Sequence, residues 1–314
     1  MRRIIACVSS AVPSTILRCY RICTLLVLST VLIFILTREP KQSLIYSETF
    51  LVRLKGPLRD DDPELLHYIQ NEILEPPSRE PYNLTGDFNR LRHQIMPTSE
   101  KFYRNHLSQI FKDKNKGVFV EAGALDGETM SITLDFEKEK DWTGLLVEVD
   151  KVSFKGLRSK HRKAWSANVC LSTDPYPAQE LFEEVHSVST IETDILAYQQ
   201  RSMSKLTKFS NLKGISQRNW SWVQCLPLQS LLKALNVSTI NLLVLDLEGA
   251  EMSVLRHLDL VGFNIEVICL EWKKYYEANK IIQELEARNY VLLVQETEDF
   301  IFAKKGSPYE HYKP

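Results

Sequence analysis

The stretch GVFVEAGALDGET occupies residues 117–129. Within it, a short apolar run ends at Glu121 and is followed by two glycines, Gly123 and Gly127. Apolar residues that stop at glycine are typical of a buried strand that enters a tight turn. This stretch alone does not say what the turn holds, so its interpretation depends on the rest of the chain.

Strand and helix patterns alternate from this stretch to the C-terminus. Apolar stretches predict strands at 118–123, 142–150, 164–172, 222–228, 240–249 and 265–272. Helical patterns fall at 99–111, 128–138, 151–160, 228–235, 250–258 and 276–288. Residues 290–305 read as two strands joined by a short polar turn. We therefore expect an α/β fold with a mostly parallel, doubly wound sheet that ends in an antiparallel hairpin.

This combination is typical of the Rossmann-like fold of S-adenosylmethionine (SAM)-dependent methyltransferases. The alternative is a nicotinamide-binding fold, which favours Gly-x-Gly-x-x-Gly after its first strand. Here Ala124, Leu125 and Asp126 separate the two glycines, so that fingerprint is absent. Residues 174–218 carry no pattern that assigns them a chemical role.

Acidic residues stand at the ends of four predicted strands. They are Glu121, Glu148, Asp246 with Glu248, and Glu271. Because ligands of open parallel sheets bind at the carboxyl ends of the strands, these acids predict one carboxylate-rich site. SAM carries an ammonium and a sulfonium group, so acids suit it, whereas they would repel a pyrophosphate.

Each position has an expected role. Gly123 and Gly127 let the backbone approach the cofactor, and Glu121 faces its cationic end. Glu148 accepts hydrogen bonds from both ribose hydroxyls of the adenosine. Asp246 positions or deprotonates an acceptor hydroxyl, alone or through a divalent cation.

Glu248 and Glu271 are expected to shape the catalytic pocket beside Asp246. Glu248 also has a simpler interpretation, which it shares with Glu251. Both open a predicted helix, where the helix dipole stabilises acidic side chains.

The N-terminus predicts a membrane anchor. Residues 22–37 are an uninterrupted apolar run that spans roughly 24 Å as a helix, and Arg18, Arg21 and Arg38 flank it. No small-x-small cleavage site follows the run, which favours an uncleaved signal-anchor over a cleaved signal peptide or a buried helix. The arginines that precede the run favour a cytoplasmic tail at residues 1–21.

The rest of the chain would then be lumenal. Residues 38–97 are rich in proline and read as a stem with one short helix, with Asp62 as its N-cap, and residues 98–314 read as the main domain. Three Asn-x-Ser/Thr sequons, at Asn83, Asn219 and Asn236, agree with this topology. We expect glycans on Asn83 and Asn236, since Asn219 lies where a strand begins.

Composition excludes several classes of function. The chain of 314 residues is 44% hydrophobic and 25% charged, with a net charge of -1, and it has no basic stripe with interleaved aromatics. We therefore expect no nucleic-acid partner. No cysteine or histidine spacing indicates zinc. Cys170, Cys225 and Cys269 allow at most one disulfide, and the simpler interpretation is that they are small buried side chains.

Three stretches together resemble the FkbM-type SAM-dependent methyltransferase family. They are residues 117–150, residues 162–172 and LLVLDLEGAEMSVLRHL at 242–258, and the resemblance extends over about residues 117–303. It implies a methyltransferase fold and SAM as the cofactor. Residues 62–84 also resemble the membrane-anchored Star-like branch. That resemblance implies an endomembrane location (endoplasmic reticulum, Golgi, endosome) and a role in moving growth-factor precursors from the endoplasmic reticulum to the Golgi.

Two functions of different class follow from the sequence. The first is an O-methyltransferase that acts on an unidentified acceptor. The second is a non-catalytic binding protein that supports vesicle-mediated transport, because SAM is made in the cytosol and a lumenal domain meets little of it. Cofactor binding discriminates between them.

Overall fold

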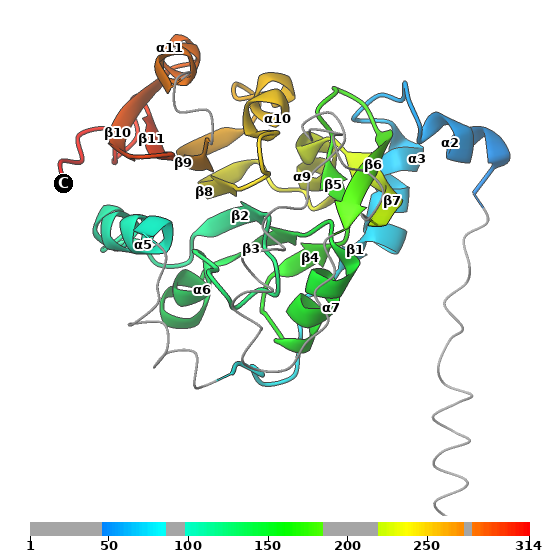
Figure 1. Ribbon diagram of the computed structural model, residues 1–314, viewed down its shortest axis with the longest axis horizontal. Coiled ribbons are helices and arrows are strands. Elements are labelled where there is room, and N and C mark those ends of the chain that lie inside the picture. Colours follow the sequence, from blue (N-terminus) through cyan, green and yellow to red (C-terminus); the bar gives the residue numbers. More distant parts are fainter. Residues whose placement is uncertain (1–45, 86–97, 185–218, 273–277) are drawn as a thin grey trace, which may run out of the picture. The chain divides into compact units, whose positions relative to one another are not determined.

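The computed structural model describes residues 46–85, 98–184, 219–272 and 278–314 (Figure 1). Residues Glu48–Pro314 form one compact unit. Within the described ranges, no helix is long and apolar enough to cross a membrane. The predicted tail and anchor, residues 1–37, lie outside the described residues, so their topology stays a prediction.

The main sheet has eight strands in the order β1-β4-β3-β2-β8-β9-β11-β10. Their bounds are β1 (Leu74–Glu75), β2 (Val118–Ala122), β3 (Thr143–Val147), β4 (Trp165–Ala167), β8 (Thr239–Leu245), β9 (Asn264–Glu271), β10 (Tyr290–Glu296) and β11 (Asp299–Lys304). The five central strands of this order, β4, β3, β2, β8 and β9, pair in parallel, whereas β1, β10 and β11 pair antiparallel. The expected α/β fold, a mostly parallel sheet with a C-terminal antiparallel hairpin, is confirmed.

Helices cover both faces of this sheet. Helices α5 (Thr98–Ile110), α6 (Leu134–Lys140) and α7 (Lys151–Ser159) share one apolar core with strands β2, β3, β8 and β9. Figure 1 shows α10 (Glu251–His257) and α11 (Ala278–Ala287) on the side opposite α6 and α7. Because both faces are covered, the central strands are apolar almost without interruption.

A second, three-stranded sheet was not expected. It has the order β5-β7-β6 and consists of β5 (Cys170–Leu171), β6 (Ala178–Glu184) and β7 (Asn219–Leu226). The strand predicted at 164–172 is therefore split between the two sheets. Asn168 lies at the break, where its amide donates to the carbonyls of Glu148 and Val149 at 2.8 and 3.1 Å.

A disulfide joins β5 to β7. Cys170 and Cys225 are register partners in these parallel strands and are covalently bonded, while Cys269 is buried and free. All three side chains are buried, as the simpler interpretation expected, but two of them are bonded to each other. The sequence allowed one bridge without naming its partners, because pairing depends on which strands become neighbours.

Much of the predicted stem belongs to the compact unit. It includes α2 (Glu48–Arg53), α3 (Pro63–Tyr68), the π-helical turn η1 (Ile69–Ile73) and the edge strand β1. Asp62 caps α3 as expected, by accepting a hydrogen bond from the backbone N–H of Glu64 at 3.0 Å. Gln70 donates to the carbonyl of Ala234 at the end of α9 (Leu228–Ala234) at 2.8 Å. The domain boundary expected near residue 98 therefore lies near residue 48.

Helix α6 begins later than predicted. A helical pattern was expected from residue 128, but α6 starts at Leu134. Asp126 accepts hydrogen bonds from the backbone N–H groups of Glu128 and Thr129 at 3.0 and 2.7 Å. This turn keeps the residues before Leu134 out of the helix. We call the resulting loop, residues 123–133, the glycine loop.

Candidate active site

The glycine loop lies against the carboxyl ends of β3 and β8. Gly123 donates its backbone N–H to the carbonyl of Val147 at 3.0 Å, and Asp246 donates its own to the carbonyl of Ala122, also at 3.0 Å. Gly123 has a φ of +89°, and a Cβ atom there would lie 2.1 Å from the Asp246 carbonyl oxygen. Glycine is therefore required by a close backbone packing contact, a reason different from the expected approach to a ligand.

Glu121 holds the far end of the glycine loop. Its side chain is buried, with 4% exposed, and accepts hydrogen bonds from the Ser131 hydroxyl at 2.9 Å and the Ile132 N–H at 2.8 Å. The Thr133 hydroxyl donates to it as well. Glu121 thus shapes the loop, and a direct contact with a cationic ligand stays a prediction.

Glu148 sits where the second parallel strand ends, as predicted. Its side chain accepts hydrogen bonds from the N–H groups of Leu125 and Asp150, both at 2.7 Å, and only 5% of the residue is exposed. Burial raises its pKa to about 7. Because each carboxylate oxygen can accept two hydrogen bonds, Glu148 retains capacity for further donors beside the loop.

The buried ion pair Arg162–Glu137 was not predicted from the sequence. Their side chains lie 3.1 Å apart and are almost completely buried. Arg162 also donates to the Gly127 carbonyl, the Ser131 hydroxyl at 3.1 Å and the Thr133 hydroxyl at 3.2 Å. A lone arginine before a predicted strand carries no pattern, so only the tertiary structure shows that it links the loop to α6.

Asp246 follows β8 and stands beside Glu271 at the end of β9. Desolvation by surrounding protein atoms, and then the charge of Glu271, raise the pKa of Asp246 well above its ordinary range. Because Asp246 remains exposed to solvent, we attribute the shift mainly to Glu271. A hydrogen bond joins the two side chains, which requires a proton on one carboxyl group.

Glu248 and Glu251 differ in their surroundings. Glu248 has a φ of +56°, and its charge contributes to the raised pKa of Asp246. Glu251 is buried, with 1% exposed, and one of its oxygens accepts hydrogen bonds from the N–H groups of Leu247 and Gly249 at 2.8 and 3.1 Å. Within the described part of the chain its other oxygen has no hydrogen-bond partner, and burial raises its pKa to about 7.

Two residues outside the predicted set lie near these acids. Tyr103 of α5 donates its hydroxyl to the carbonyl of Leu270 at 2.9 Å, and Asp299 is the cross-strand partner of Glu271. Burial, and then the charge of Asp299, raise the pKa of Tyr103. No three His, Cys, Asp or Glu side chains of the described ranges are placed to hold a metal ion.

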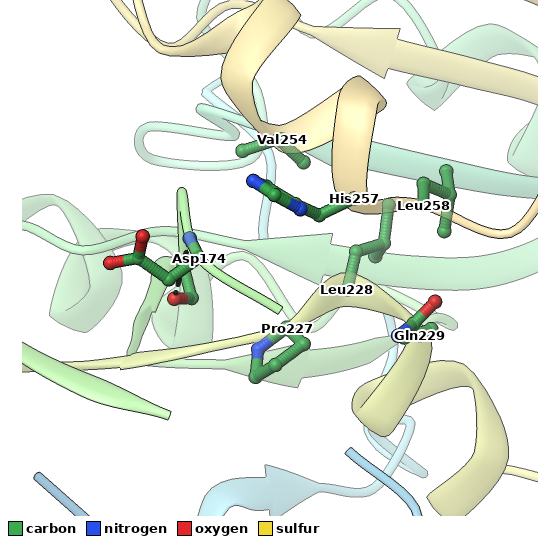
Figure 2. A pocket seen from close by; sticks show the side chains of 8 residues that line it. Asp174, Pro227, Leu228, Gln229, Val254, His257 and Leu258 are labelled. Atoms are coloured by element: carbon green, nitrogen blue, oxygen red, sulfur yellow. Dashed lines mark hydrogen bonds between the residues drawn. The ribbon is translucent and has the colours of Figure 1, made fainter. Parts of the chain in front are cut away.

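A shallow recess lies elsewhere, and Figure 2 shows His257 of α10 projecting into it. Its lining residues are Ser172, Asp174, Pro227, Leu228, Gln229, Val254, His257 and Leu258. None of them was predicted as a site residue. Ser172 donates its hydroxyl to the carbonyl of Tyr176 at 2.7 Å, so it is engaged in the local turn.

Both expected glycosylation sites are exposed. Asn236 lies in the turn between α9 and β8 with a φ of +54°. Asn83 donates its side-chain amide to the carbonyl of Ser159 at 2.9 Å. Asn83 is therefore docked on the domain and still exposed to solvent.

The mixed sheet, its glycine loop and its strand-end acids are those of a methyltransferase-like α/β protein. Residues 121–292, more than half of the chain, match the family model described as the Methyltransferase FkbM domain. The chain therefore belongs to the FkbM methyltransferase family. No curated protein matches it.

Two solved structures are among those similar to it. One is a human methyltransferase 10 domain containing protein, 11% identical, with a TM-score of 0.34 over 79% of this chain and 98% of that one. The other is a METTL16 methyltransferase domain, 13% identical, with a TM-score of 0.35 over 79% of this chain and 82% of that one. These likenesses are too remote to bear on function.

Proposed function

We propose that this protein binds SAM against the glycine loop and transfers its methyl group to an acceptor oxygen. One observation carries the proposal. Glu148, the glycine loop and Asp246 lie together at the carboxyl ends of the central parallel strands, in a chain of the FkbM family. Membership of a methyltransferase family indicates SAM as the cofactor.

The residues present fit this cofactor. Glu148 would hold the ribose hydroxyls, since its oxygens retain acceptor capacity and lie beside the turn at Leu125. The acids around Asp246 would favour a cationic group over an anionic one. When bound, SAM supplies an electrophilic methyl group.

Asp246 and Glu271 would act on the acceptor. Asp246 would accept the proton of the acceptor hydroxyl as the acceptor oxygen takes the methyl group, and the rest of the cofactor would leave as a neutral thioether. A raised pKa makes Asp246 a better base than an ordinary aspartate, once it is ionised. Asp246, Glu248 and Glu271 would also orient the acceptor, and this orientation would contribute to the rate of methyl transfer.

Calorimetric titration of the full chain with SAM tests the proposal. We expect Glu148→Ala to weaken SAM binding by about tenfold to hundredfold, because hydrogen bonds to a charged group contribute about 1.5–3 kcal/mol. Asp246→Asn is nearly isosteric and should change affinity by at most a few-fold. Absence of binding by folded wild-type protein at about millimolar SAM, far above usual cofactor affinities, would refute the proposal. Equal affinity of wild type and Glu148→Ala would mean that the ribose lies elsewhere.

A second candidate is the transport role implied by the Star-like resemblance. We propose a single-pass type II protein of the endomembrane system, with residues 38–314 lumenal. The Cys170–Cys225 disulfide supports this location, because such bonds persist in oxidising compartments. Without SAM binding, the domain would serve as a binding module for membrane-bound growth-factor precursors, and co-purification with such cargo would test that role.

A further inference from the structure

Residues 74–85, which we call the strap, lie outside the segment matched by the family model. The strap begins as β1, where Leu74 pairs with Ala167 of β4. It then follows the chain that leads into β4: Ser78 donates its N–H to the Arg162 carbonyl at 3.0 Å, and Asn83 donates its own to the Lys160 carbonyl at 3.1 Å. Prolines at 76, 77 and 81 stiffen it, which lowers the entropy lost on docking.

The end of the strap contacts the glycine loop directly. Thr85 donates both its N–H and its hydroxyl to one oxygen of Glu128, at 3.0 and 2.6 Å. The Lys160 ammonium lies 2.6 Å from the same oxygen. Glu128 belongs to the glycine loop and is 5% exposed, so its charge depends on these few partners.

A second contact reaches the loop through Glu137. The Tyr82 hydroxyl donates to one oxygen of this buried carboxylate at 3.0 Å, and Arg162 donates to the other at 3.1 Å. Arg162 in turn donates to the Gly127 carbonyl and to the Ser131 hydroxyl, which itself donates to Glu121. One chain of hydrogen bonds thus runs from the strap to the first predicted cofactor residue.

We propose that the strap is a structural part of the cofactor site and that Tyr82 and Thr85 are positioning residues for the glycine loop. Two side-chain hydroxyls of the strap donate to buried carboxylates. One carboxylate, Glu128, belongs to the glycine loop. The other, Glu137, is linked to the loop through Arg162, which donates to a loop carbonyl. The part of the inference that concerns cofactor affinity rests on the proposed function.

Three variants of the full chain test this role, with amide hydrogen exchange and SAM titration as readouts. Tyr82→Phe and Thr85→Val each remove one hydroxyl donor, and Thr85→Ser keeps the hydroxyl. The matched control is Tyr290→Phe, which removes a similar donor, to the Ile265 carbonyl at 2.9 Å, on β10. Tyr82→Phe also leaves the Asn83 sequon intact, which separates its effect from any loss of glycan.

We expect Tyr82→Phe and Thr85→Val to speed exchange within residues 123–133 and to weaken SAM binding by about threefold to tenfold. Thr85→Ser and Tyr290→Phe should each leave the exchange rate of the glycine loop and the SAM affinity at the wild-type level. Unchanged exchange in the glycine loop, or exchange that rises equally throughout the sheet, would overturn the inference. If the wild type does not bind SAM, the proposed function fails, and the exchange data still decide whether the strap holds the loop.

Discussion

At the residue scale, the site is defined by acids whose environments differ. Glu121 and Glu148 each accept several hydrogen bonds, while Asp246 stands exposed beside a second carboxylate. Carboxylates therefore hold the loop structure at Glu121 and Glu148, whereas the proposed chemistry belongs to Asp246. What distinguishes them is the number of donors within reach and the nearness of like charges.

Glu251 gives a prediction about pH. Burial raises its pKa from 4.5 to about 7, so the folded state binds this proton more tightly than the unfolded state does. Stability from this residue therefore falls as pH rises from 4.5 to 7 and stays low above that range. We expect Glu251→Gln to raise the free energy of unfolding by about 1–3 kcal/mol at about pH 8 and little at about pH 4.5.

Urea denaturation of both proteins at several pH values measures this difference. Gln keeps an oxygen that can accept the N–H groups of Leu247 and Gly249, so the variant isolates the charge. A difference in stability that is the same at every pH would show that the Glu251 charge is not what lowers stability.

At the scale of elements, the site depends on how a turn packs against a neighbouring strand. Strand β2 lies between β3 and β8, so the turn that follows it meets the ends of both. The contact between Gly123 and the Asp246 carbonyl brings the proposed cofactor loop and the proposed catalytic acid together through their backbones. A change at this contact should therefore affect both.

Substitution of glycines tests this packing. Gly123 and Gly306 both have positive φ, +89° and +82°, but no atom lies within 4 Å of a Cβ added at Gly306. We expect Gly306→Ala to lower the free energy of unfolding by about 1–2 kcal/mol, the usual effect of a side chain at positive φ. Gly123→Ala should lower it by about 3 kcal/mol or more, because the new methyl group also collides with backbone. Thermal and chemical denaturation compare the two, and equal effects would contradict the close contact.

At the scale of the whole molecule, the compact unit is larger than the family domain. It begins at Glu48, whereas the family match begins at residue 121. Strand β1 therefore lies outside the match, while the second sheet and the disulfide lie within it. A chain that starts near residue 98 would lack the strap and β1. Binding studies therefore require a chain that retains residues from at least 48.

Topology supplies the last prediction. If residues 38–314 are lumenal, protease added to sealed microsomes should leave this part intact, and detergent should expose it. Digestion without detergent would contradict the proposed orientation. Site-resolved mass spectrometry of the same material should find glycan on Asn83 or Asn236, both of which are exposed. Unmodified asparagine at both positions would count against passage through the lumen.

The sequence by itself determined the alternation of strands and helices, the parallel sheet with its closing hairpin, and the placing of acids at strand ends. These features are local, because periodicity and strand-to-turn transitions are written in neighbouring residues. Only the tertiary structure decided the rest. The predicted strand is interrupted at Asn168, and Cys170 is bonded to Cys225. Helix α6 begins only at Leu134, and the strap binds Glu128 and Glu137. Each of these features depends on contacts between residues that are distant in the sequence. Such contacts are set by which elements become neighbours in space, and they leave no periodic pattern in the sequence.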